Sequence, residues 1–370
     1  MKIKPFKLER YFAKYEFSAP YLLSSSDCEP LALSELLALA DGDCRALWNN
    51  LKLAYTESQG HPLLREEISK MYAGISKEDI LVLVPEEGIF AAMNVLLESG
   101  DNVVSTFPGY QSLYQVAEIN NCAVSRWRPG KNLQFNVEDL LALLTDRTKL
   151  IVINFPHNPT GGMISRPDLD KIVAAARKRN IVIFSDEMYR LLEYDEKDRL
   201  PSVCEVYENG VSLGGLSKTF GLPGLRLGWL ATRNKAIQGE LAAFKDYTTI
   251  CGSAPSEVLG IIALRNKEKL RNNNLGIIRG NLALIEAFAA RHSGWFSWKT
   301  PKAGSVAFPE IRIKESAAEF CEQLVKEKGI MLLPSDVYDY DRKCVRFGFG
   351  RKTLPEVLPI FEAYITQKGY

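Results

Sequence analysis

The sequence predicts an open, doubly wound α/β fold built on a mostly parallel sheet, followed by a smaller α+β part. Short runs of Val, Ile and Leu, bounded by turn residues, recur between about residues 78 and 232. Runs of this kind are typical of strands buried on both faces of a helix-covered sheet. Helical patterns alternate with them, so the ligand is expected at the carboxyl ends of the strands.

The expected strands and helices follow one another along this region. The strands lie within DILVLVPEEG, DNVVSTFPG, KLIVINFPHNPTGG, NIVIFSDEMY, GVSLGGLSK and LGWLAT. The helices between them lie within GIFAAMNVLLES, YQSLYQVAEINN and RPDLDKIVAAARKRN. In the last of these, Pro167 is near the first turn and the helix is expected to end near Asn180.

The pattern changes from about residue 255 onward. Longer helical stretches come first, followed by the strand-like GSVAFPEI, a helix near SAAEFCEQLVKEKG, and the strand-like IMLLPS and CVRFGFGR. The chain opens with a helical pattern, FKLERYFAKYEF, that has no clear place in the central sheet. We therefore expect a large domain at residues 45–255 and a small domain formed by residues 1–44 together with 256–370.

Composition excludes several classes of function. The 370 residues include 46 basic and 45 acidic side chains, a balance that favours neither nucleic acid nor an anionic membrane as partner. No apolar run reaches the ~18 residues of a membrane span, and the start of the chain is too charged for a signal peptide. Seven scattered cysteines and three distant histidines predict no metal site. We expect a cytoplasmic protein.

Polar residues and one glycine turn follow four of the predicted strands. They are Gly88 in EEGIF, Asn158, Asp186, Tyr189, Ser217 and Lys218. Taken singly, each is explained by a helix cap or a solvated side chain. The loops at the carboxyl ends of a doubly wound sheet share one crevice, so together these residues predict a single ligand site.

Five motifs in order then give a specific resemblance. They are YTESQGHPLLR (55–65), NPTG (158–161), SDEMY (185–189), SKTFGLPGLRLGW (217–229) and VRFGFGR (345–351). The chain resembles the class I/II aminotransferase family of fold-type I enzymes, which depend on pyridoxal 5′-phosphate (PLP). The resemblance implies a seven-stranded sheet in a PLP-binding large domain.

The resemblance also implies roles around the cofactor ring. Lys218 would form the internal aldimine and later act as a base, both of which require a neutral amine. Asp186 would hold the ring nitrogen protonated, which makes the ring an electron sink. Asn158 and Tyr189 would donate hydrogen bonds to the phenolic oxygen. Tyr110 matches the aromatic residue that stacks on the ring, with Tyr114 as a competing candidate.

The cofactor phosphate requires amide donors, hydroxyl groups and a cation. The turn before GIFAAM offers the amides of Gly88 and Ile89, while Ser217 and Arg226 match the family's hydroxyl and guanidinium groups. Many members of the family have a second serine three residues before the lysine, where this chain has Gly215. We therefore expect the phosphate site to have one hydroxyl fewer, or a water molecule in its place.

Two further positions concern partners. Tyr55 matches the tyrosine that reaches the phosphate of a second subunit, which implies a homodimer with shared active sites. Arg346 matches the arginine that binds the substrate α-carboxylate through two hydrogen bonds. The family pattern also implies a cis peptide bond between Asn158 and Pro159.

The resulting hypothesis is a PLP-dependent aminotransferase that transfers an amino group between an L-amino acid and a 2-oxo acid. The opening segment resembles capreomycidine synthase-like enzymes, so the alternative is a cyclase or lyase acting on a basic amino acid. Glu16, Ser24, Ser25 and Asp27 could then line the substrate end of the cleft, where an acidic residue would suit a cationic side chain, although a solvated helix face is the favoured interpretation of Glu16.

Interpretations from other classes fit less well. A P-loop requires glycine immediately before the lysine, where this chain has Ser217. A dinucleotide-binding turn would follow an early strand, whereas GLPGLRLG follows a late one and has the wrong spacing. A noncatalytic protein with this fold would be expected to lose Lys218 or Asp186, and both are present.

Overall fold

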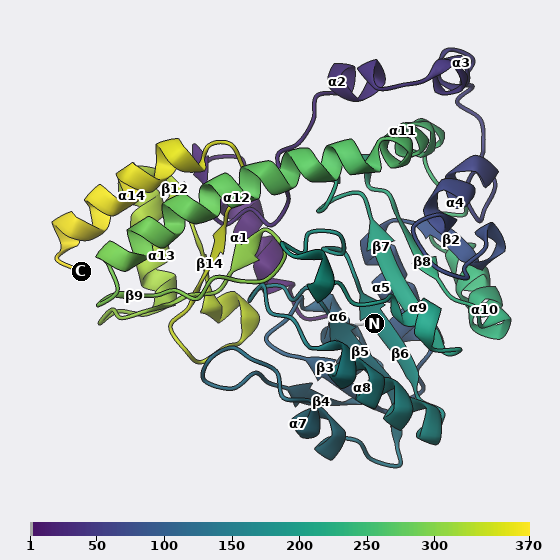
Figure 1. The fold of residues 1–370 in the computed structure, drawn as a ribbon. Coiled ribbons are helices and arrows are strands. Elements are labelled where there is room, and N and C mark those ends of the chain that lie inside the picture. Colours follow the sequence, from purple (N-terminus) through teal and green to yellow (C-terminus); the bar gives the residue numbers. More distant parts are fainter. Residues whose placement is uncertain (1–2) are drawn as a thin grey trace.

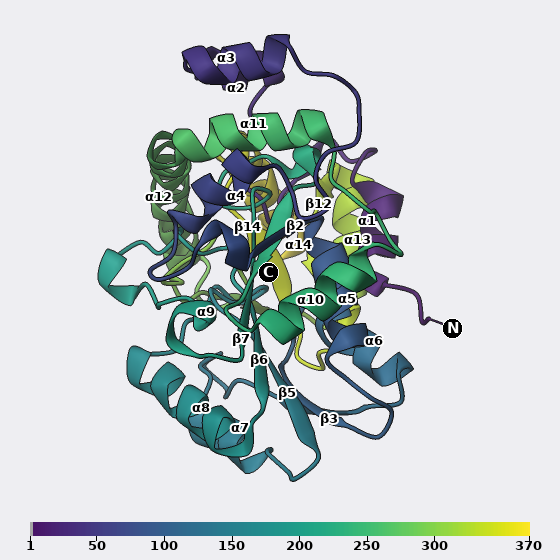
Figure 2. The same ribbon diagram turned by 90° about the vertical axis from the view of Figure 1, so that its right-hand side faces the viewer.

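A seven-stranded mixed sheet forms the centre of the fold in the computed structural model, which describes residues 3–370 (Figures 1 and 2). In spatial order the strands are β2 (Ile80–Leu83), β8 (Gly228–Ala231), β7 (Gly210–Gly215), β6 (Val182–Asp186), β5 (Thr148–Asn154), β3 (Asn102–Thr106) and β4 (Ala123–Trp127). Strand β8 is antiparallel to both of its neighbours, and all other pairs are parallel. The predicted fold class is confirmed.

The six predicted strands are all present, and one further strand was not predicted. Strand β4 pairs with β3 at the edge of the sheet, and only its last residue, Trp127, is fully buried. Because an edge strand has fewer neighbours to cover it, its sequence AVSRW lacks the continuous apolar run that identifies the inner strands.

Successive side chains of each strand point to opposite faces of the sheet, so the buried residues are divided between the two faces. Leu81, Val103 and Val152 pack with α5 (Pro85–Val95), α6 (Ser112–Ile119) and α10 (Lys235–Lys245). Their neighbours point to the opposite face. There Ile80 packs under α4 (Pro62–Ser69) and α11 (Ala254–Arg265), and Val104 packs under α7 (Val137–Ala142), α8 (Arg166–Arg179) and α9 (Val203–Val206).

Helix α8 shows how local sequence sets an element's ends. The Ser165 side chain accepts a hydrogen bond from the Asp168 amide, which caps the first turn, and Pro167 lies within that turn. The helix ends at Asn180, which adopts a left-handed conformation with φ of 52°. Both sequence predictions for this helix are confirmed.

After α11 the chain forms a second group of helices and short strands, outside the central sheet. Its helices are α12 (Lys267–Arg291), α13 (Ala317–Lys328) and α14 (Leu354–Lys368). Its short strands are β9 (Phe296–Ser297), β10 (Val306–Ala307), β11 (Glu310–Ile311), β12 (Ile330–Met331), β13 (Leu333–Pro334) and β14 (Val345–Gly348). The 3₁₀ helices found in residues 3–370 are η1 (Lys77–Asp79), η2 (Glu196–Asp198), η3 (Pro223–Leu225) and η4 (Ser335–Tyr338). Within residues 3–370, no helix combines the length and apolar character needed to cross a bilayer.

One section of the N-terminal region packs on the C-terminal elements, and the next section packs on α11. Helix α1 (Lys7–Tyr15) contacts η4, and β1 (Tyr21–Leu22) pairs in parallel with β12. Helices α2 (Leu33–Ala38) and α3 (Gly42–Asn49) instead lie on α11, on the side away from the sheet (Figures 1 and 2). The domain limits at residues 44/45 and 255/256 remain a proposal.

Segment 23–28 lies directly on β14. The Gly348 amide donates to the Leu23 carbonyl oxygen at 2.7 Å. A Cβ atom on Gly348 would lie only 2.1 Å from the Ser25 carbonyl oxygen. Glycine is therefore required at this position for the N-terminal segment to approach the strand.

Gly348→Ala is expected to lower the free energy of unfolding by about 2–3 kcal/mol, because backbone must move to relieve the overlap. Gly280 is the matched control, since it occupies helix α12 and a Cβ atom at that position would have no neighbour within 4 Å. Gly280→Ala should raise stability by about 0.5–1 kcal/mol. Urea unfolding followed by fluorescence measures both changes, and equal effects would contradict the packing described.

Candidate active site

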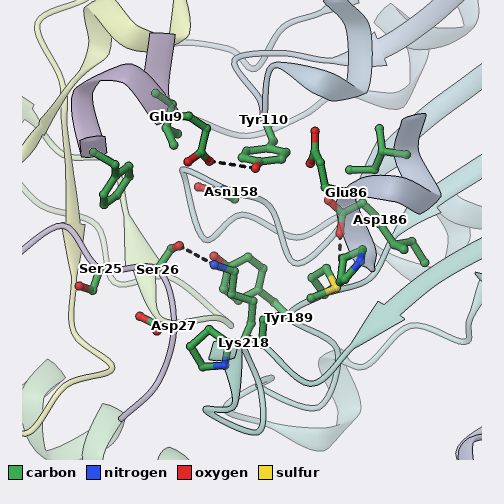
Figure 3. A pocket seen from close by; sticks show the side chains of 18 of the residues that line it. Glu9, Ser25, Ser26, Asp27, Glu86, Tyr110, Asn158, Asp186, Tyr189 and Lys218 are labelled. Atoms are coloured by element: carbon green, nitrogen blue, oxygen red, sulfur yellow. Dashed lines mark hydrogen bonds between the residues drawn. The ribbon is translucent and has the colours of Figure 1, made fainter. Parts of the chain in front are cut away.

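A cavity of about 330 Å³ lies at the carboxyl ends of β5, β6 and β7, facing α1 and segment 25–27 (Figure 3). Its size is that of a small-molecule pocket. All but two of the predicted site residues line it: Ile89, Tyr110, Asn158, Asp186, Tyr189, Ser217, Lys218, Arg226 and Arg346. The exceptions are Gly88 and Tyr55.

Lys218 lies three residues beyond β7, at the centre of the cavity. Its Nζ donates a hydrogen bond to Ser26 Oγ at 2.9 Å. Burial lowers the pKa of Lys218, and the nearby Asp27 carboxylate opposes this shift. The amine is therefore neutral more often than a solvated lysine, which suits a nucleophile and base.

Asp186 is the last residue of β6, and burial raises the pKa of its carboxyl group to about 6. The Met188 amide donates to Oδ1 at 3.1 Å, and this bond and the charge of Lys218 both favour ionisation. A cationic N–H group placed in the cavity would favour it further. The carboxylate is thus suited to hold a protonated ring nitrogen.

Asn158 and Tyr189 line the same cavity as Lys218. The peptide bond before Pro159 is cis, as predicted, and the Asn158 amide donates to Asn154 Oδ1 at 2.8 Å. The Asn158 Oδ1 atom accepts from Arg346 Nη1 at 3.4 Å, which leaves the Nδ2 hydrogens available as donors. The hydroxyl of Tyr189 is buried and has no partner among residues 3–370.

Arg346 lies on β14 and is only 1% exposed. Its Nε donates to the Ser24 carbonyl oxygen at 3.0 Å and its Nη1 to the Tyr338 hydroxyl at 2.9 Å. Nη2 has no partner in the described part of the chain. A buried, unpaired guanidinium N–H is costly, so this side chain is prepared for an anionic ligand such as a carboxylate.

The N-terminus of α5 corrects one prediction. The Gly88 amide donates to the Val84 carbonyl oxygen at 3.0 Å, so it is not free to bind a phosphate. Ile89 is one residue deeper in the helix, past the free N–H groups of the first turn. Pro85 has no N–H, which leaves the amides of Glu86 and Glu87 as the donors at this end. Gly88 instead allows close packing, since a Cβ would lie 2.8 Å from Leu83 Cδ1.

The remaining phosphate candidates are Ser217 and Arg226. The Ser217 hydroxyl is buried without a partner among the described residues. Arg226 follows η3 with a left-handed φ of 50° and lines the cavity. At Gly215, a Cβ would come within 2.9 Å of the Met188 side chain and 3.2 Å of Pro85 Cγ. A serine at this position would require the end of the Met188 side chain to move.

The two tyrosines considered for stacking on the cofactor ring differ in whether they line the cavity. Tyr110 lines the cavity, and its hydroxyl donates to Glu9 Oε1 at 3.0 Å (Figure 3). Tyr114 is buried in a cluster with Phe107 and does not line the cavity. Tyr55 is 89% exposed on the surface of its own chain, so its predicted role depends on a second subunit.

Several lining residues were not predicted. Glu9, Phe12, Ser26 and Glu86 all border the cavity, and burial raises the pKa of Glu86 to about 7. Glu16 also lines the cavity, so the interpretation of this residue as part of a solvated helix face is wrong. The spacing of residues 9, 12 and 16 on one side of a helix was a signal that could have found three of them.

The polar groups of the cavity that lack hydrogen-bond partners are suited to bind PLP and a substrate. Ser217 Oγ, Tyr189 OH and Arg346 Nη2 are buried polar atoms without partners in the part of the chain that the structure describes, and all three belong to residues around one cavity. Buried polar atoms are normally paired, so unpaired ones at a cavity indicate a ligand with matching acceptors. Phosphate, phenolate and carboxylate oxygens would satisfy them, and Lys218 would meet the aldehyde.

Comparison with known proteins agrees with this geometry. Residues 35–358 match the family model described as aminotransferase class I and II. Capreomycidine synthase from Streptomyces vinaceus is 30% identical over 271 residues, which cover 72% of this chain and 69% of that protein.

Two solved structures are similar over nearly the whole chain. A PLP-dependent aminotransferase from Streptococcus suis 89-1591 has a TM-score of 0.92 and 30% identity over 99% of both chains. The PLP-dependent cyclase OrfR has a TM-score of 0.85 and 27% identity over 95% of this chain and 94% of that one. The chain belongs to the class I and II aminotransferase family of fold-type I, PLP-dependent enzymes.

Proposed function

We propose that the protein is an aminotransferase that moves an amino group between an L-amino acid and a 2-oxo acid. The observation that supports this most strongly is that the partly buried Lys218 amine shares one cavity with the Asp186 carboxylate and with Arg346, whose Nη2 has no partner among the described residues. When bound, PLP supplies an aldehyde that exchanges amino groups and a ring that accepts electrons.

The residues of this chain would divide the work of binding and proton transfer. Arg346 would hold the substrate α-carboxylate, which fixes the direction of the Cα–H bond. Lys218 Nζ would then take the proton from Cα. Asp186 would keep the ring nitrogen protonated and so stabilise its positive charge. Ser217 and Arg226 would anchor the phosphate.

Helix α1 would close the site against water. Leu8 and Phe12 line the cavity from this helix, and Leu8 is buried. Excluding water strengthens the charge interactions inside the cavity and protects reactive species from hydrolysis.

A homodimer would complete the site. Leu53, Tyr55 and Tyr247 are at least 88% exposed, an unusual exposure for large apolar side chains unless another molecule covers them. Tyr55 would supply its hydroxyl to the cofactor phosphate of the partner subunit.

A second candidate is a cyclase or lyase that acts on a basic amino acid, and one observation favours it. The acidic lining residues are Glu9, Glu16, Asp27, Glu86 and Asp186. The basic ones are Lys218, Arg226 and Arg346, and each has a role above. Arg351 pairs with Asp27 at 2.9 Å, but Glu9 and Glu16 form no ion pair within residues 3–370. A cationic substrate side chain would balance these two carboxylates.

Lys218→Ala tests the proposed function. The wild-type holoenzyme should transfer the amino group of a suitable L-amino acid to the cofactor, and a 2-oxo acid should restore the original absorbance spectrum. The variant should lose this reaction by at least about a thousandfold, because it lacks both the attachment point and the base. Release of ammonia without a reversible spectral change would support the second candidate, and a fully active variant would refute both.

Charge matching predicts which amino acid binds. L-Arginine should bind the holoenzyme at least about tenfold more tightly than the uncharged L-citrulline, measured by spectral titration, because a charge facing Glu9 and Glu16 is worth roughly 1.4 kcal/mol or more. The double variant Glu9→Gln, Glu16→Gln should abolish the preference. Glu322→Gln is the control, since Glu322 contacts Lys14 on α1 outside the cavity. No preference in the wild type would contradict a cationic substrate.

Mixed dimers test the shared site. Tyr55→Phe removes one hydroxyl and should weaken PLP binding about tenfold. In a heterodimer with Lys218→Ala, the intact Lys218 faces the partner's Tyr55, so PLP affinity should return to the wild-type value. An affinity that stays weak in the heterodimer would mean that Tyr55 acts within its own chain or not at all.

A further inference from the structure

Ser26 is the side chain that contacts the Lys218 amine. Lys218 Nζ donates to Ser26 Oγ at 2.9 Å, and no other hydrogen-bond acceptor for Nζ occurs among residues 3–370 (Figure 3). Ser26 comes from segment 23–28, 192 residues away in the chain. None of the family motifs includes it.

The position of Ser26 is fixed from both sides. Its own carbonyl oxygen accepts a hydrogen bond from Ser305 Oγ at 2.8 Å. On one side, the Ser24 carbonyl oxygen accepts from Arg346 Nε at 3.0 Å. On the other side, Asp27 forms a two-oxygen pair with Arg351. The segment that carries this hydroxyl is therefore bonded to Arg346 on β14 and to Ser305 and Arg351 outside that strand.

The choice of a neutral hydroxyl has a chemical consequence. A carboxylate in direct contact with Nζ would stabilise its charged form and raise its pKa, so the amine would stay protonated and have no lone pair to take a proton from Cα. Asp27 is near enough to have this influence, but its carboxylate is engaged by Arg351. Ser26 can orient the amine without adding a charge.

Orientation matters because lysine is flexible. The side chain of a free lysine has about 2 kcal/mol of rotamer entropy, and proton transfer requires the lone pair of Nζ to face the substrate Cα. A hydrogen bond from one N–H to a fixed hydroxyl removes much of that freedom. It leaves the lone pair available.

We propose that Ser26 is a positioning residue that holds the freed Lys218 amine while it exchanges a proton with the substrate Cα. This inference rests on the proposed function. In the step concerned, the proton moves from Cα to Nζ, the electron pair of the C–H bond enters the conjugated cofactor, and Ser26 keeps its own proton throughout. Ser26 thereby links the group that binds the carboxylate to the group that moves the proton.

Rapid-mixing measurements on the holoenzyme test the proposal, with L-arginine and its Cα-deuterated form as probes. Ser26→Ala should slow proton transfer about 10- to 100-fold and enlarge the deuterium isotope effect. The dissociation constant of the amino acid should change by less than about threefold. Ser26→Thr retains the hydroxyl and should recover most of the rate.

Ser24→Ala is the matched control. Its hydroxyl is buried in the same segment, has no partner among the described residues and does not line the cavity, and the substitution leaves its carbonyl oxygen in place. Its rate should equal that of the wild type. An equal loss in Ser24→Ala, or a loss of amino acid affinity rather than rate in Ser26→Ala, would overturn the proposal.

A second measurement does not depend on turnover. Cofactor-free protein is mixed with PLP, and the rate at which Lys218 captures the aldehyde is followed by absorbance. Ser26→Ala should capture PLP about tenfold more slowly, with Ser26→Thr and Ser24→Ala near the wild-type rate. If no amino acid reacts with the wild type, the proposed function fails, but this comparison still decides the role of Ser26. An unchanged capture rate in Ser26→Ala would refute it.

Discussion

The partial burial of Lys218 inside the cavity is the constraint on which the rest of the site depends. Removing this group from water lowers its pKa and makes it reactive, but a buried amine also needs a hydrogen-bond partner. Ser26 provides that partner without a charge. The same burial raises the pKa of Asp186 to about 6, so the carboxylate gains most from a cationic ligand. The two groups are thus matched to a ligand that brings both an aldehyde and a ring N–H.

Two parts of the chain have to meet for this burial to occur. The central sheet supplies Lys218 and Asp186, while β14 and the N-terminal segment supply Arg346 and Ser26. Gly348 lets the two latter pieces pack together, because any side chain there would strike the Ser25 backbone. Strand β14 and the N-terminal segment therefore form the side of the cavity that faces the sheet. A shift of β14 would displace Arg346 and Ser26 together.

The sequence predicted the inner strands and most of the polar residues that line the cavity, because both leave local signals. Buried strands show continuous apolar runs, and the motifs around Lys218 and Asp186 have fixed spacing. The edge strand β4 left no such signal, since it is half-exposed. The Gly88 amide was wrongly predicted to be free, because α5 begins at Pro85 and Gly88 already bonds within the helix. Contacts such as Lys218 with Ser26 join distant segments, and only the tertiary fold brings them together.

The central claim is that one buried amine takes the cofactor, and direct identification of the modified residue tests it. The holoenzyme is reduced with borohydride, digested and examined by peptide mass spectrometry. The account predicts a pyridoxyl phosphate group on the peptide that contains Lys218, at close to one group per chain. Modification spread over exposed lysines such as Lys4, with Lys218 unmodified, would contradict it.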